Sequence, residues 1–331
     1  MQQAANGERI RWVERVQVFS MLLVVLHHCI PHGYDGSAGL LALLEAIQYP
    51  ALACFFLTSG LFAGKYREAG WPAYMRKRFT RLMTPYFCVN LLMLAPRYVA
   101  ARLMGFQPKL TPAWLLMSFL NPHGQGIAPH LWFLPTLLLC ASLLPVLDAL
   151  MGRGRAARSA LLVALLALSL MPVRLTSLFC LEELRRYLVF YAAGHALART
   201  RGLDCPLRGR AGRAVGAAGL AAFALILILC PASPLAAGWY ALGGGAALLA
   251  LAGLSAGNDP LTRFFRGKTF TIYILSMCAQ NLAEAVGYSA RLPWFVTAGA
   301  MLVLGLAVPC AWHRLDRAHP LPRFLRLMTG L

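Results

Sequence analysis

Charged side chains are scarce in this sequence, and acidic ones are the scarcest. Only 13% of the 331 residues are charged, with 12 Asp and Glu against 31 Lys and Arg, whereas 59% are hydrophobic. A soluble domain carries about 25% charged residues. Surface-to-volume scaling also prevents a chain of this size from burying so large an apolar share. The shortage of polar surface therefore excludes an ordinary soluble domain and indicates a membrane protein.

Cysteine pairs of the kind that bind metals are missing as well. The nine cysteines form no CxxC pair, and six of them lie within apolar stretches: Cys54, Cys88, Cys140, Cys230, Cys278 and Cys310. Thiols in such surroundings are usually inert packing residues. We therefore expect no metal site, no disulfide framework and no permanently bound cofactor.

A nucleic-acid partner is also excluded, although the net charge of +19 could suggest one. The Lys and Arg residues fall in short runs between apolar segments. They form no continuous basic and aromatic surface that a nucleic acid could follow. Membrane lipids are the partners that this pattern predicts.

Ten apolar segments run through the chain, and at about 20 residues for each spanning helix they account for most of its apolar share. The sequence predicts an all-α transmembrane bundle of about ten helices. The stretch 107–129 is rich in Pro and Gly and reads as a loop or re-entrant segment, with a short amphipathic piece at Trp114 to Leu120. The first segment has no small-x-small cleavage site and is expected to be a retained helix. The segments are residues 16–31, 46–63, 84–104, 130–150, 159–173, 182–198, 214–232, 236–254, 269–288 and 294–312.

Lys and Arg alternate between the two sides of this predicted bundle. With the N-terminus inside, the inner connections hold 24 of the 31 basic residues. Basic residues concentrate in cytoplasmic loops, so both termini are predicted to be cytoplasmic. The other seven are Arg97, Arg102, Lys109, Arg174, Arg185, Arg186 and Arg291.

Residues 211–257 are almost entirely Ala, Gly and Leu, including Gly212-xxx-Gly216 and the run Gly243 to Gly245. Small residues let membrane helices approach closely, so helix packing is the favoured role here. No long linker divides the chain, and residues 1–331 are treated as one membrane-embedded domain.

The first helix carries a polar stripe. At 100° per residue, Glu14, Gln17 and His28 share one face with Met21 and Val24. Polar groups facing lipid are costly, so this face should point into the bundle or a water-filled cavity. His28 can take and give a proton near neutral pH. Packing of two interfacial histidines, His27 and His28, is an equally weighted alternative.

Two further segments combine polar residues with an apolar context. Ser59 precedes Gly60 at the end of an aromatic stretch, where a kink or close packing is the simpler interpretation. Arg78 and Arg81 are one helical turn apart and lie close to Arg76. They are either ordinary positive-inside charge or a clamp for a phosphate-bearing donor, because arginine forks match phosphate oxygens.

The remaining candidates lie in the fourth segment and near the end of the chain. His130 and Trp132 open the segment Pro-His-Leu-Trp-Phe-Leu-Pro, where an interfacial aromatic belt is the alternative. Tyr273 and Ser276 precede Gln280 and Asn281 within one late span. A single polar residue in a membrane span often forms a hydrogen bond to a neighbouring helix, whereas several of them indicate a cavity lined by polar groups.

In their order along the chain these blocks resemble the acyltransferase type 3 family of integral membrane enzymes. The first block of that family places an acidic residue, an Arg and a His along helix one. Glu14 and His28 match the acidic residue and the His. The other matching blocks are residues 56–60, 76–86 and 130–135, so the resemblance spans essentially the whole chain. Gln17 stands where the family has Arg, and Ser276 stands where a late Ile-Tyr-Leu-Leu-His run has His.

This resemblance implies transfer of an acyl group, often acetyl, from cytosolic acyl-CoA to a hydroxyl on a surface glycan or related extracytoplasmic acceptor. His28 would be the general base or acyl relay. Glu14 lies about 20 Å further along the helix and would act at the donor end with Gln17. Arg76, Arg78 and Arg81 would hold the phosphates of coenzyme A. His130, Trp132, Tyr273, Ser276 and Ser59 would line the passage or the acceptor site.

Two readings from other classes compete with this one. A glycan transporter would need symmetric broken helices in two halves, and the sequence shows no internal repeat. A catalytically silent scaffold or sensor is favoured by the departures at Gln17 and Ser276. A measurement of acetyl-CoA binding would distinguish these alternatives, because the enzyme should bind acetyl-CoA and the scaffold should not.

Overall fold

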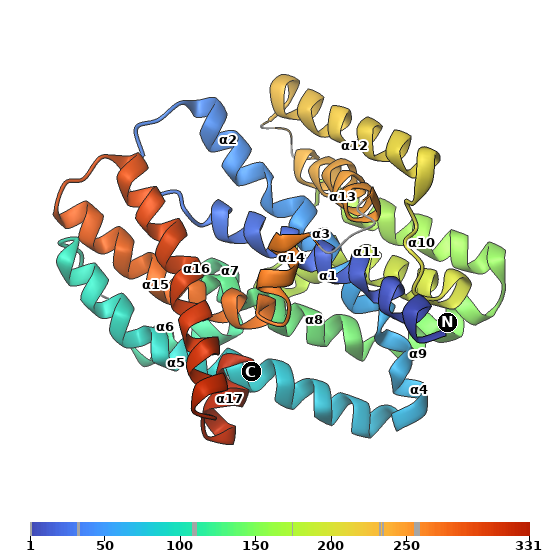
Figure 1. Ribbon diagram of the computed structural model, residues 1–331, viewed down its shortest axis with the longest axis horizontal. Helices are drawn as coiled ribbons and strands as arrows, with labels where there is room; N and C mark the ends of the chain where they lie inside the picture. Colours follow the sequence, from blue (N-terminus) through green and yellow to red (C-terminus); the bar gives the residue numbers. More distant parts are fainter. Residues whose placement is uncertain are drawn as a thin grey trace.

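The computed structural model describes residues 2–31, 34–107, 111–173, 175–231, 233, 235–254 and 259–331. These residues form helices, with no strand among them (Figure 1). The predicted all-α class is therefore confirmed, whereas Arg174 and Lys109 lie outside the described residues. The longer helices are α1 (Gln2–His27), α3 (Gln48–Leu61), α5 (Trp71–Leu103), α10 (Arg155–Leu170), α11 (Leu181–Arg201), α12 (Gly209–Leu229), α13 (Ala236–Leu254), α15 (Thr269–Ser289) and α16 (Trp294–Ala318).

Shorter helices connect these elements or extend them. The predicted amphipathic piece in the 107–129 stretch is helix α6. The short elements are α2 (Ala38–Ala46), η1 (Ala63–Lys65), α4 (Tyr66–Ala69), α6 (Pro112–Leu120), α7 (Pro122–Gln125), η2 (Pro129–Trp132), α8 (Phe133–Ser142), α9 (Leu144–Gly152), η3 (Leu178–Cys180), α14 (Pro260–Phe265) and α17 (Arg323–Thr329).

Each of the ten predicted apolar segments overlaps at least one helix, but α1 begins at Gln2 and α5 at Trp71, both well before the predicted starts at residues 16 and 84. Among the described residues, 4 helices are long and apolar enough to cross a membrane, or up to 5 if the bent pair of residues 129–142 and 144–152 is one span. Several other long helices, such as α1 and α11, carry charged side chains within the bundle. Ten spans and cytoplasmic termini therefore stay predictions.

Two of the predicted segments are broken helices with a proline in the first turn of the second part. Pro50 follows the break at Ile47 between α2 and α3. Pro145 follows the break at Leu143 between α8 and α9, where the chain bends by 45°. Proline is tolerated in a first turn because the N–H that it lacks would have no intrahelical partner there.

Helix α3 crosses α11 at very short range. A Cβ added to Gly60 would lie 2.0 Å from the carbonyl oxygen of Tyr191, and one on Gly194 would lie 1.9 Å from that of Leu57. Only glycine permits this approach, so the close-packing interpretation of Gly60 agrees with the structure. The contact fixes the end of α3 that carries Ser59.

Helices α12 and α13 lie side by side in the same manner (Figure 1). A Cβ on Gly219 would meet the carbonyl oxygen of Gly243 at 2.5 Å, which fits the packing role predicted for this small-residue region. The outer face of α12 exposes Val215, Leu220 and Ile228, the last of them 76% exposed. Such a continuous apolar face is suited to lipid contact.

One end of the bundle gathers most of the ion pairs, and we call it the basic end. Here α1 begins and α5 begins, while α9 and α11 end. Arg15 pairs with Asp259 at 3.1 Å, and Asp148 accepts hydrogen bonds from Tyr66 at 2.6 Å and from His195 at 3.0 Å. Burial raises the pKa of Asp259, but hydrogen bonds from Thr262 and Arg15 outweigh it and hold the pKa below its ordinary value.

Candidate functional site

A cavity of 560 Å³ opens at the basic end between α1, α3, α5, α8 and α15. We call it the basic cavity, because Lys77, Arg78 and Arg81 line it. Its volume lies within the range of about 300–1,000 Å³ that is usual for small-molecule sites. Five predicted site residues line it: Gln17, Ser59, Arg78, Arg81 and Tyr273.

Helix α5 supplies the positive charge through one face. Tyr74, Lys77, Arg78 and Arg81 recur at helical spacing and all line the cavity. The Arg78 guanidinium lies 5.3 Å from the centre of the Tyr74 ring, and that of Arg81 lies 5.9 Å from the Phe270 ring. These cation–π contacts hold both guanidinium groups at the cavity wall.

Arg76 is exposed and does not line the basic cavity. It is two residues from Arg78, which is about 200° around the helix. Arg76 was grouped with Arg78 and Arg81 because the three are close in sequence. Lys77, which was not chosen as a site residue, lines the cavity instead, and its i, i+4 spacing to Arg81 is the sequence signal that could have identified it.

Helix α1 contributes Gln17 and Val24 to the cavity wall, so the predicted polar stripe faces the interior at these positions. Glu14 lies one turn earlier and pairs instead with Arg266 at 2.8 Å. It does not line the cavity. The structure thus places Glu14 at the basic end, in an ion pair between α1 and the segment after α14.

Tyr273 and Phe133 line the inner part of the basic cavity. The Tyr273 hydroxyl donates a hydrogen bond to the backbone carbonyl of His130 at 2.6 Å. Its ring centre lies 5.8 Å from that of His130. Tyr273 therefore joins the cavity wall to a buried histidine, which is 5% exposed.

His28 faces His130 at the far side of this wall. The two imidazole rings are 6.3 Å apart between centres, with planes at 76°. The Nε2 atom of His130 is 3.4 Å from the carbonyl oxygen of Ile274, and its Nδ1 has no hydrogen-bond partner among the described residues. His28 follows Val24 by one helical turn, so the cavity ends about one turn short of this histidine pair.

Neighbouring His27 is held differently. Its Nδ1 lies 2.9 Å from the carbonyl oxygen of Leu44 in α2, although its ring centre is 4.8 Å from that of His28. His27 thus ties the end of α1 to α2, whereas His28 turns toward His130. The two adjacent histidines have different surroundings, as their 100° separation predicts.

Trp132 and Ser276, like Arg76, Glu14 and the histidine pair, do not line the basic cavity. Trp132 stacks between His123, at 5.5 Å between ring centres, and Tyr187, at 5.6 Å. Ser276 is 3% exposed on α15 and lines none of the three cavities described here. Gln280 holds α15 to α1. It donates hydrogen bonds to the carbonyl of Val25 at 3.0 Å and to the Cys29 sulfur at 3.3 Å.

A second cavity, of 590 Å³, lies at the opposite end of the bundle. We call it the distal cavity. Pro31, the end of α5, the end of α15 and the start of α16 line it, and Glu284, Tyr288 and Trp294 are among its side chains. None of the residues chosen from the sequence belongs to it. Their spacing carries no motif, and three separate helix ends bring them together.

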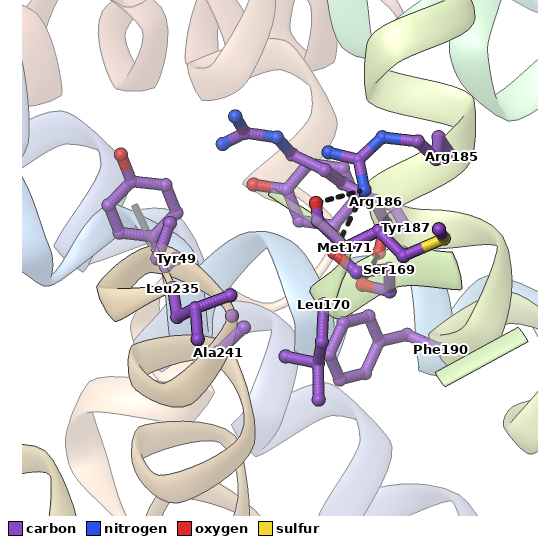
Figure 2. A pocket seen from close by; sticks show the side chains of 12 residues that line it. Tyr49, Ser169, Leu170, Met171, Arg185, Arg186, Tyr187, Phe190, Leu235 and Ala241 are labelled. Atoms are coloured by element: carbon purple, nitrogen blue, oxygen red, sulfur yellow. Dashed lines mark hydrogen bonds between the residues drawn. The ribbon is translucent and has the colours of Figure 1, made fainter. Parts of the chain in front are cut away.

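A third pocket, between α3, α10, α11 and α13, has room for about one water molecule, with 30 Å³. Figure 2 shows Arg185 turned to the backbone carbonyls of Ser169 and Met171, at 3.2 and 3.1 Å, while Arg186 reaches toward Tyr49. Glu182 pairs with both arginines. Arg185 thus caps the carbonyl end of α10, which is a structural role.

Among the described residues, no group of three or more His, Cys, Asp or Glu could hold a metal ion. The site brings together the imidazoles of the histidine pair, the hydroxyl of Tyr273 and the cations of α5.

Comparison with known proteins gives one match, to a protein family. A family model described as an acyltransferase domain matches residues 10–312, which takes in the basic cavity, the histidine pair and the distal cavity. Neither a curated protein nor a solved structure gives a significant match. Because the match covers most of its 331 residues, the chain belongs to the acyltransferase type 3 family and is a membrane acyltransferase.

Proposed function

We propose that this protein transfers an acyl group, with acetyl the simplest case, from cytosolic acyl-CoA to a hydroxyl of a surface glycan or related acceptor on the other side of a bacterial inner membrane. The observation that carries the proposal is the basic cavity. It begins among Lys77, Arg78 and Arg81 and reaches Tyr273, which holds His130 opposite His28.

The basic end is assigned to the cytoplasm. Basic residues concentrate on that side of membrane proteins, and both Arg15 and the C-terminal helix α17, through Gly330 beside Phe270, belong to this end. The proposal includes about ten spans, both termini in the cytoplasm, and one acyltransferase domain over residues 1–331.

The cations of α5 suit the donor. Guanidinium forks match the oxygens of phosphate groups, and coenzyme A carries its phosphates at one end and its thioester at the other. With the nucleotide at Arg78 and Arg81, the pantetheine arm extends along α1 from Gln17 toward His28. These two residues are roughly 16 Å apart along the helix.

The proposed chemistry needs one base and one displaced thiolate. His28 removes the proton from the acceptor hydroxyl while that oxygen attacks the thioester carbonyl. The tetrahedral intermediate collapses, the carbon–sulfur bond breaks, and the thiolate takes the proton from the imidazolium. Gln17 offers the donor a hydrogen bond but no charge. The α5 cations supply the positive charge in the cavity.

The decisive experiment compares His28→Ala with His27→Ala in purified protein reconstituted into nanodiscs. Acetyl-CoA binding and CoA release are measured for both, and acetylated surface glycans are measured by mass spectrometry in cells carrying each variant. Positioned acid–base catalysis contributes about 10²- to 10⁴-fold. We expect a loss of that order in His28→Ala, and near-normal transfer in His27→Ala.

Full transfer by His28→Ala would remove the catalytic role of this histidine. Failure of the wild-type protein to bind acetyl-CoA would favour the silent scaffold instead.

A further inference from the structure

A short non-helical segment, residues 126–128, leads directly into η2, the turn that carries His130. This segment is buried, with Ile127 and Ala128 both 0% exposed. Buried backbone N–H and C=O groups that belong to no helix need hydrogen-bond partners from elsewhere, and the interior of a membrane protein offers little water to supply them. The groups that satisfy this segment therefore also help to set the position of His130.

Arg97 of α5 binds two consecutive carbonyls of this segment. Its Nη1 donates to the carbonyl oxygen of Gly126 at 2.8 Å and to that of Ile127 at 2.7 Å. Hydrogen bonds from a charged donor are stronger than those between neutral groups. Basic residues gather in cytoplasmic loops, and Arg97 is one of the seven that lie elsewhere in the predicted bundle. The contact with residues 126 and 127 gives this arginine a structural partner there.

Asn90 binds the same segment from the same face of α5, seven residues or about two turns before Arg97. Asn90 is 0% exposed, and its Oδ1 accepts a hydrogen bond from the Ala128 N–H at 3.2 Å. Its Nδ2 donates to the carbonyl oxygen of Tyr86 at 2.8 Å, which fixes the orientation of the amide. Together the two side chains bind all three residues of the segment.

Helix α15 holds His130 from the other side. The Tyr273 hydroxyl donates to the backbone carbonyl of His130 at 2.6 Å, and the Nε2 atom of His130 is 3.4 Å from the carbonyl oxygen of Ile274. The imidazole that faces His28, at 6.3 Å between ring centres, thus lies between α15 and a segment fastened to α5. A displacement of about 1 Å, even when its cause is remote from the reacting atoms, can cost about 10²-fold in rate.

We propose that Arg97 and Asn90 are positioning residues for acyl transfer, which act through His130 by holding the segment that precedes it. This inference rests on the proposed function, because it gives the imidazole opposite His28 a part in the transfer. Neither Arg97 nor Asn90 lines the basic cavity. Their loss should therefore lower the rate of transfer and leave the binding of the donor unchanged.

The test is a double-mutant cycle that combines Arg97→Met with His130→Asn in the full-length protein. Arg102→Met is the matched control, because Arg102 is exposed on the same helix and lines none of the three cavities described above. Arg97→Lys is the conservative variant, since its ammonium can still donate to carbonyl oxygens.

Rates are measured in inside-out membrane vesicles from cells that lack the native gene and express one variant each. Radiolabelled acetyl-CoA is added outside, and the label retained by washed vesicles is followed over a range of acetyl-CoA concentrations. Vesicles from the same cells without any copy of the gene give the background. Rates are expressed per amount of folded protein, so that a loss of stability alone does not change them.

We expect Arg97→Met to lower the maximal rate roughly ten- to hundred-fold with an unchanged KM for acetyl-CoA, while Arg97→Lys retains most of the rate. In the His130→Asn background, Arg97→Met should cause no further loss, because the ring that the segment positions is already gone. Arg102→Met should match its parent in both backgrounds. If the His130→Asn rate is below detection, the rescue by Arg97→Lys and the unchanged KM decide.

A full maximal rate in folded Arg97→Met or in His130→Asn overturns the inference, and so do losses that multiply when the two substitutions are combined. A raised KM for acetyl-CoA with an unchanged maximal rate overturns it as well, since that would place Arg97 in donor binding. Asn90→Ser is taken through the same cycle with the same expected result, so the test does not depend on the folding of one variant.

A failure of the proposed function would have a different signature. In that case vesicles with the wild-type protein would retain no more label than the background.

Discussion

At the scale of single residues, the direction of a side chain decides its role more than its chemical type does. Arg76 and Arg78 are identical and nearly adjacent, yet only Arg78 lines the basic cavity. His27 and His28 are likewise adjacent, and they face Leu44 and His130 respectively. Such neighbouring pairs provide matched controls, because substitution in each pair changes the same chemistry in a different place.

Arg78→Ala is expected to weaken acetyl-CoA binding, whereas Arg76→Ala is not. A hydrogen bond to a charged group contributes about 1.5–3 kcal/mol. The lower figure applies here because the mouth of the cavity is partly exposed, and it corresponds to roughly a ten-fold change in affinity. Isothermal titration of both variants with acetyl-CoA provides the measurement. Equal weakening by the two substitutions would show that only the general positive charge matters.

Periodicity predicts which residues share a face of one helix, but it does not say which neighbour that face meets. The stripe Gln17 and Val24 was correctly placed in the interior, and the pairing of Ser59 with Gly60 marked a cavity wall beside a helix crossing. Glu14 fits the same stripe and yet pairs with Arg266. That contact depends on a residue about 250 positions away in the chain, which no local pattern encodes.

At the scale of helices, the close approach of α3 and α11 at their crossing sets the position of the cavity wall. Glycine at both contact points lets backbone meet backbone, so α3 cannot shift without α11. The apolar segments alone predicted both helices closely, because hydrophobic length is a strong signal in a membrane protein. The broken helices at Ile47 and Leu143 were not predicted, because proline in a first turn is compatible with either a kink or a new helix.

Gly60→Ala is expected to destabilise the protein, because its Cβ would lie 2.0 Å from the Tyr191 carbonyl oxygen. Overpacking typically costs about 1–3 kcal/mol, so the thermal midpoint in detergent should fall. Gly39→Ala in α2 is the control, since a Cβ there meets nothing within 4 Å, and its midpoint should be unchanged or slightly higher. A fall of the same size in the control would show that the crossing is not the cause.

At the scale of the whole molecule, two cavities of similar volume open at opposite ends of the bundle, with a histidine pair between them. The sequence predicted the basic cavity in part, through Arg78, Arg81 and Tyr273. The distal cavity escaped prediction because Pro31, Glu284 and Trp294 come from helix ends far apart in the chain, each with ordinary local surroundings. Only the tertiary structure brings these ends together.

The orientation of the bundle leads to a labelling prediction. Gly154, in the turn before α10, lies at the basic end, and Ala290, after α15, lies at the other. In a Cys230→Ser background, which removes the one cysteine classed as exposed among the described residues, Ala290→Cys should react with a membrane-impermeant maleimide in intact cells. Gly154→Cys should react only after the membrane is permeabilised. The reverse pattern would invert the proposed orientation.

The wall of Val24, Phe133 and Tyr273 that ends the basic cavity has a further consequence for the cell. Under the proposed function, coenzyme A would enter and leave by the same side, and the acyl group that it delivers would reach an acceptor beyond this wall. In the proposed reaction the acyl group passes this wall, which spans about one helical turn between Val24 and His28. An enzyme that works in the proposed way would modify the outside of a cell with a donor that never leaves the cytoplasm.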